Sequence, residues 1–288
     1  MYCHNTPSWN GFSYLTKLKV LKVIFQTDDD ITRRKLCMAL TNSLINVAGT
    51  LTELSLSNWI EGSNHCDEIT RDLTTVIPEL KALKTIEIFG MAIDPDLSMY
   101  LKNSKILAIN FDSLLTEYYS FKPDIFEGKN RKTLTELDLT SCQVSNDFLY
   151  NIANCVENVK ILKVSCERVT DIGIVAISKI KFLQHLYLFG HSHVTDSSIK
   201  LLKKLKILHL PNSNKITNDS VTKILENSPK MKEFHIVESA ITADFIKKAS
   251  EITRNRKKKL KLEVSFIPGI KQYQSPYLDI IQNPPKKN

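Results

Sequence analysis

The sequence predicts an α/β fold made of about ten similar units, each contributing one β-strand and one α-helix. Three observations predict it: a pattern of apolar residues that recurs along most of the chain, an alternation of apolar and polar residues within each copy, and a helix-start signal after the later copies. A unit of this size cannot bury both of its apolar faces alone. The units are therefore expected to stack side by side into a solenoid with one shared core.

The recurring pattern is an apolar residue, a second one three positions later and a third two positions after that. Nine copies follow one another at intervals of 22 to 33 residues, which is too regular a series to arise by chance. Their first residues are Leu18, Leu51, Leu83, Ile106, Leu134, Val159, Leu183, Leu205 and Met231. A tenth, degenerate copy lies at Leu262 and Val264.

Each copy alternates apolar and polar residues over its last four positions, which is the period of a half-buried strand. In the second half of the chain, a Thr or Ser and then an acidic residue or Asn follow each strand, at 144–147, 169–171, 194–196, 216–219 and 241–244. A Thr or Ser at this place can cap a helix, and an acidic residue is favourable in the positive first turn. Apolar residues at helical spacing follow, for example Ile174 and Ile177.

One segment identifies a family resemblance: Cys166-Glu167-Arg168-Val169-Thr170-Asp171, with Cys142 in nearly the same place one copy earlier. It resembles the cysteine-containing leucine-rich repeats of F-box proteins, although His191, Ser213 and Ser239 stand where later copies would have cysteine. The resemblance implies a curved horseshoe over residues 15–266, with parallel strands on the concave face and helices on the convex face. Residues 1–14 would be an N-terminal segment, and 267–288 a cap followed by a loose tail.

Composition excludes several classes of protein. The 8 glycines are too far apart for a phosphate-binding glycine loop. No apolar run is long enough to span a membrane, and no signal peptide is visible. The 6 cysteines form no CxxC pair, which favours a reduced cytoplasmic or nuclear setting. The net charge of +8 permits an anionic partner without requiring one.

A partner is expected on the concave face, where the polar positions of each strand point outward. Two zones of this face differ in chemistry. The first, here called the acidic zone, consists of Glu53, Glu87, Asp112, Glu136 and Asp138. The second, here called the aromatic–imidazole patch, consists of His185, Tyr187, Phe189, Ile207, His209, Pro211, His235 and Val237. Exposed aromatic residues on a rigid surface are typical anchors of protein interfaces, so the patch is the stronger candidate.

The other clusters of reactive or charged residues in the sequence predict neither catalysis nor a bound cofactor or metal ion. His209 and His235 occupy equivalent positions about 5 Å apart on neighbouring strands, but nothing in the sequence fixes them into a tetrahedral site. Cys142 and Cys166 are expected to pack inward as small apolar groups. The basic run from Arg254 to Lys261 is interpreted as a helix end and a solvated turn, with nuclear localisation as the alternative. It lacks interleaved aromatic residues, so nucleic acid is not expected as a partner.

The family resemblance implies a function without catalysis, the recognition of another protein. The first hypothesis is the substrate-recognition part of an F-box (SCF-type) ubiquitin ligase, which acts in ubiquitin-dependent protein degradation. About 14 residues precede the first repeat and show no F-box opening, so a Skp-type adaptor and a cullin are expected as partners only if an F-box lies upstream. The alternative is a stand-alone cytosolic scaffold or inhibitor with no link to ubiquitin.

Overall fold

The computed structural model describes residues 15–25, 30–58, 75–89, 108–112, 130–140, 142 and 144–284. The chain divides into two compact units. The first unit comprises Met1–Cys142 with Cys155–Asn158, and the second comprises Gln143–Asn154 with Val159–Asn288. Both are mixed α/β structures with parallel strands, so the expected fold class is confirmed at that level.

The strands of the first unit pair in parallel, in chain order. They are β1 (Val20–Phe25), β2 (Glu53–Asn58), β3 (Thr85–Phe89), β4 (Ala108–Asp112) and β5 (Glu136–Leu139). The described helical segments are α1 (Asp30–Asn46), η1 (Ile77–Glu79) and α4 (Asn130–Thr133). Leu54, Leu56, Ile86 and Ile88 are at most 1% exposed, because alternate positions of each strand face the core.

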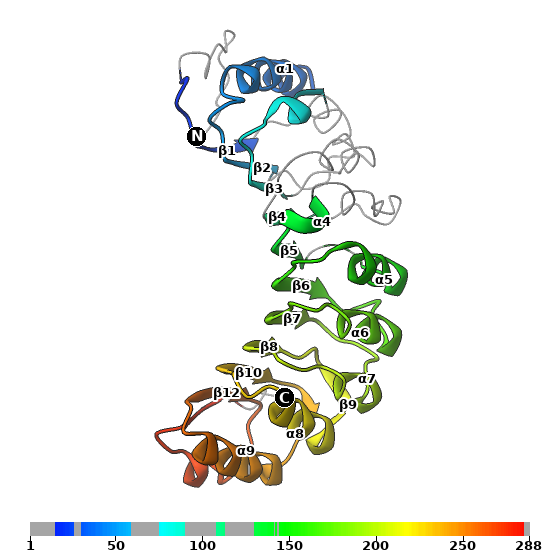
Figure 1. Cartoon of the computed structure of the whole chain (residues 1–288), viewed down its shortest axis with the longest axis vertical. Helices are drawn as coiled ribbons and strands as arrows, with labels where there is room; N and C mark the ends of the chain where they lie inside the picture. Colours follow the sequence, from blue (N-terminus) through cyan, green and yellow to red (C-terminus); the bar gives the residue numbers. More distant parts are fainter. Residues whose placement is uncertain are drawn as a thin grey trace. The chain divides into compact units, whose positions relative to one another are not determined.

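The second unit alternates strands and helices and contains the copies in which the apolar sequence pattern is most regular. Its parallel sheet contains β6 (Ile161–Ser165), β7 (His185–Phe189), β8 (Ile207–His209), β10 (Glu233–Ile236), β12 (Leu260–Val264) and β13 (Leu278–Gln282). Its helices are α5 (Asn146–Cys155), α6 (Asp171–Ile177), α7 (Asp196–Ile199), α8 (Asn218–Asn227) and α9 (Ala243–Arg256). Figure 1 shows these helices on one side of the strands. A small second sheet pairs β9 (Ser213–Thr217) with β11 (Ser239–Ala240).

The register of the strands follows the recurring sequence pattern. Lys163 pairs with Tyr187, Tyr187 with His209, His209 with His235, and His235 with Glu263. The residues that alternate with these outward positions along each strand, such as Leu186, Leu208 and Phe234, are fully buried. A shift by one residue would exchange the two faces, so burial of the aliphatic set fixes the register.

After residue 266, where a cap and then a loose tail were expected, the chain adds one more strand at the edge of the sheet. Strand β13 pairs in parallel with β12 along its whole length, and η3 (Ile270–Tyr273) precedes it. Ile270 and Leu278 are fully buried. The added strand satisfies the backbone groups that β12 would otherwise leave unpaired at the sheet edge. Residues 285–288 lie outside the described part of the chain.

The expected Thr caps are confirmed, and each is joined to the preceding repeat. The side chains of Thr170, Thr195, Thr217 and Thr242 each accept a hydrogen bond from the backbone N–H two residues later. A carboxylate or amide from the previous helix start also binds each cap. The pairs are Asn146 with Thr170, Asp171 with Thr195, Asp196 with Thr217, and Asn218 with Thr242. These bonds form a ladder from repeat to repeat, which we call the cap ladder.

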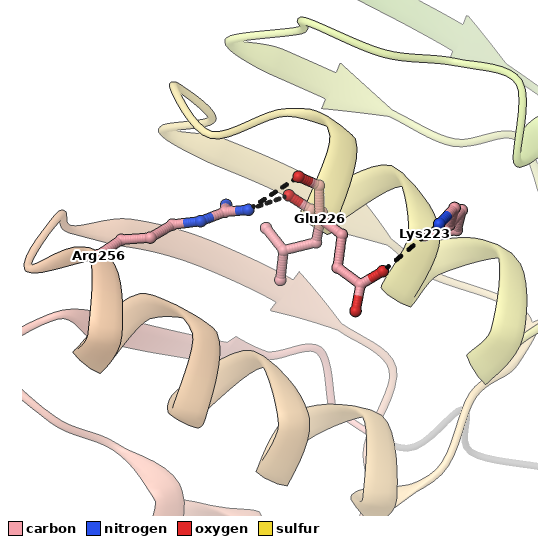
Figure 2. A network of polar contacts seen from close by, with 4 residues as sticks. Lys223, Glu226 and Arg256 are labelled. Atoms are coloured by element: carbon pink, nitrogen blue, oxygen red, sulfur yellow. Dashed lines mark hydrogen bonds and ion pairs between the residues drawn. The ribbon is translucent and has the colours of Figure 1, made fainter.

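The basic run contains one structural arginine. Arg256 Nη2 donates to the carbonyl oxygens of Leu225 (2.8 Å) and Glu226 (3.1 Å) at the C-terminal end of α8. Figure 2 shows the guanidinium group extended from the end of α9 towards these carbonyls. The last carbonyls of a helix have no partner within the helix, and a cation is favourable there. Arg256 thus lies at the end of α9, as the helix-end interpretation expects, but the carbonyls that it binds belong to the preceding helix α8.

Replacing Arg256 with alanine is expected to lower the free energy of unfolding by about 1 kcal/mol, because the carbonyls of Leu225, Glu226 and Ser228 lose a charged donor. Lys258, in the same run, is exposed, and alanine there is expected to change stability by less than about 0.5 kcal/mol. Urea unfolding monitored by circular dichroism measures both values. Equal effects of the two substitutions would contradict a specific role for Arg256.

Candidate functional site

The aromatic–imidazole patch is formed by three neighbouring strands of the second unit. Strand pairing places Tyr187, His209 and His235 side by side in one row, with His185 and Ile207 in the row before it. All five side chains are partly buried. The structure thus brings together the residues that the sequence analysis selected. Val237 is also partly buried, whereas Pro211 is buried and therefore offers no contact surface.

The rings of the patch contact one another. The ring centroids of Tyr187 and His209 lie 4.6 Å apart, and those of His209 and His235 lie 3.6 Å apart in a stacked arrangement. The ring of Phe189 is 6.2 Å from those of Tyr187 and His209. Neighbours that restrict each ring reduce the conformational entropy lost when a partner binds. The four rings therefore form an ordered aromatic surface.

Charged groups surround this surface. Lys163 Nζ lies 6.0 Å from the centre of the Tyr187 ring, a distance that allows a cation–π interaction. On the other side, Nδ1 of His235 is 3.0 Å from Oε2 of Glu263, and Nε2 is 4.0 Å from Oε2 of Glu233. Glu263 pairs in register with His235 on the next strand, and neither carboxylate was among the residues selected from the sequence. Glu233 could have been selected from the sequence, because it lies two residues before His235 on the same strand and so on the same face.

The two histidines of the patch favour the neutral form. Burial, together with the neighbouring His235 and Lys261, lowers the pKa of His209 to about 4. Burial also lowers the pKa of His235, and Lys261 adds to this effect, although Glu263 and Glu233 act in the opposite direction. Desolvation disfavours the charged imidazolium in both cases. Both rings therefore act as neutral imidazoles near neutral pH.

The acidic zone lies in the first unit and is less uniform than expected. Glu53 is exposed, and Glu87 and Glu136 are partly buried. Asp138 was expected on the surface but is only 9% exposed, and its Oδ1 accepts hydrogen bonds from the backbone N–H and the hydroxyl of Thr140. These local bonds fold the carboxylate onto its own turn. The side chain of Asp112 lies outside the described part of the structure.

The cysteines occupy different environments. Cys166 is fully buried, and burial raises the pKa of its thiol to about 12. A thiol of this kind is a poor nucleophile, which confirms its expected inward packing. Cys142 is only partly buried.

His191 and His193 are exposed, outside the stacked rings of the patch.

A separate pocket of about 390 Å³ is formed by the residues that precede strands β7, β8 and β10 in the chain. It is lined by Lys181, Phe182, Leu183, Gln184, Lys204, Lys206, Pro229 and Lys230. Lys181 Nζ lies 5.2 Å from the centre of the Phe182 ring. Four of these lining residues are lysines, and none is a carboxylate, a histidine or a thiol.

Comparison with known proteins assigns no family to the chain. No family model matches the sequence, and no curated protein matches it significantly. Among the helices of the described ranges, none combines the length and apolar character needed to cross a bilayer.

Proposed function

We propose that the chain is a non-catalytic leucine-rich-repeat protein that recognises another protein through the aromatic–imidazole patch. The single observation that carries the proposal is the set of interlocked rings of Tyr187, Phe189, His209 and His235 on adjacent strands. Large aromatic groups that are held in place, rimmed by charged residues, are the usual centre of a protein interface. The repeated strand–helix units and their strand register support the leucine-rich-repeat assignment.

A more specific proposal follows from the resemblance to F-box proteins. In it, the chain is the substrate-recognition part of an SCF-type ubiquitin ligase, and the patch holds the protein to be degraded. A stand-alone scaffold or inhibitor would use the same patch. Affinity purification of the native protein distinguishes these roles, because a Skp-type adaptor and a cullin co-purify only with a ligase component.

The test of the patch is the double substitution Tyr187→Ala with Phe189→Ala. Loss of these two side chains is expected to weaken binding to a purified, co-purifying partner about a hundredfold, since aromatic anchors contribute several kcal/mol to an interface. Surface plasmon resonance measures the affinity. The thermal midpoint of the variant is expected to stay close to that of the wild type, because neither side chain belongs to the fully buried core.

The matched control is Glu53→Ala with Glu87→Ala, which removes two outward side chains of the first unit. It is expected to leave the affinity unchanged. If this control weakens binding while the aromatic substitutions do not, the acidic zone is the binding surface instead. A large loss of stability in the aromatic variant would make Tyr187 and Phe189 structural residues.

A further inference from the structure

Three side chains at one edge of the patch offer the ligand atoms of a metal site. A nitrogen of His209, a nitrogen of His235 and a carboxylate oxygen of Glu233 all lie within 4.8 Å of one another. They come from adjacent parallel strands, β8 and β10, whose pairing fixes their backbones in register. Two imidazoles and one carboxylate, with a position left open, form a common ligand set for zinc.

Glu263 gives His235 the orientation that a metal ligand needs. Its carboxylate can only accept a hydrogen bond, so Nδ1 of His235, 3.0 Å away, is the donor. The lone pair of the neutral ring is then on Nε2, the nitrogen that faces Glu233 at 4.0 Å. A carboxylate that holds the second nitrogen of a histidine is a regular feature of zinc sites in proteins.

One nearby group opposes metal binding: Lys261, which pairs in register with Glu233 and contributes positive charge. Its effect provides a test of the site.

Metal binding requires a small rearrangement. Zinc lies about 2.0–2.1 Å from nitrogen and oxygen ligands, so tetrahedral ligand atoms are about 3.4 Å apart. The rings of His209 and His235 are stacked with an interplanar angle of 17°, so their lone pairs lie in nearly parallel planes and do not converge on one ion. Binding therefore requires the His209 ring to turn about its broad Cβ–Cγ torsion and to leave the stack with His235.

We propose that His209, Glu233 and His235 bind a zinc ion, that Glu263 positions His235, and that the remaining coordination position is open to water or to a group of the bound partner. The site goes beyond protein recognition, since zinc binding needs no partner. Failure of this proposal would therefore leave the proposed recognition function intact.

The experiment is a calorimetric titration of the full chain, stripped of metal and kept reduced, with Zn²⁺ alone. One site per chain is expected. His209→Gln and Glu233→Gln should each weaken it by more than about tenfold, and Glu263→Gln by about tenfold. Lys261→Met should strengthen binding, because it removes the nearby positive charge. Circular dichroism confirms the fold of each variant.

The matched control is the pair His191→Gln and His193→Gln, which removes exposed histidines outside the cluster and should leave zinc affinity unchanged. Absorption of the Co²⁺-loaded chain separates this site from cysteine binding, since nitrogen and oxygen ligands give visible bands without the strong thiolate charge transfer. Absence of a zinc site, thiolate absorption, or full affinity in folded His209→Gln and Glu233→Gln variants would overturn the proposal.

Discussion

Replacing Asp171 with alanine is expected to lower the free energy of unfolding by about 3 kcal/mol, because several donors lose a charged acceptor at once. Asp171 accepts hydrogen bonds from the backbone N–H of Thr195 (2.8 Å) and from the hydroxyls of Thr195 (2.7 Å), Ser197 (2.8 Å) and Ser198 (2.5 Å). Thr195 is itself the cap of α7. The substitution therefore weakens both a helix start and the connection between two repeats. Urea unfolding at neutral pH measures the loss.

Asp171→Asn is the matched control, because asparagine fills the equivalent place at Asn146 and Asn218. In both cases the amide accepts from the backbone N–H of the next cap and donates to its hydroxyl. The asparagine variant is therefore expected to lose less than about 1 kcal/mol. If it is destabilised as much as the alanine variant, the cap ladder does not carry the effect.

The same hydrogen bonds make the free energy of unfolding depend on pH under acidic conditions. Burial acts to raise the pKa of Asp171, but the hydrogen bonds from Ser198, Thr195 and Ser197 outweigh it and hold the pKa below its ordinary value of 3.8. A carboxyl group whose pKa is lower in the folded than in the unfolded protein stabilises the fold at pH values above its unfolded-state pKa. This contribution is lost as the pH falls through its folded-state pKa. Stability of Asp171→Asn should consequently fall less steeply than that of the wild type below about pH 4.

Replacing Gly173 with alanine is expected to destabilise the second unit by about 2 kcal/mol, although alanine favours helices by about 1 kcal/mol over glycine. A Cβ atom at Gly173 would lie 2.6 Å from Oδ1 of Asn146, 2.9 Å from Cδ1 of Leu149 and 2.9 Å from Cγ1 of Val169. None of these atoms can move cheaply. Leu149 and Val169 are at most 1% exposed, and the Asn146 oxygen accepts the backbone N–H of Thr170.

Gly49→Ala tests whether this effect comes from packing. A Cβ atom at Gly49 would meet nothing within 4 Å, so alanine there should be neutral or slightly stabilising. Thermal unfolding of the two variants gives the comparison. A Gly173→Ala variant as stable as the wild type would show that the neighbouring helices adjust without cost.

Much of the candidate site follows from a pattern of period two. The aliphatic residues of each repeat must be buried, and this requirement fixes which side chains face outward and which are neighbours across strands. Tyr187, His209 and His235 could therefore be placed in one row from the sequence. The helix caps could be predicted for a similar reason, because a Thr cap and its helix start are only two residues apart.

Contacts between repeats were decided by the tertiary structure. Asp171 was interpreted through its own helix, whereas its carboxylate binds a cap 24 residues away. The closeness of Glu233 to His235 depends on side-chain torsions, and so does the burial of Asp138 against Thr140. Sequence periodicity determines the face on which a side chain lies. Its rotamer and its polar partner depend on the neighbouring repeat, because a buried polar atom takes whichever partner packing brings within reach.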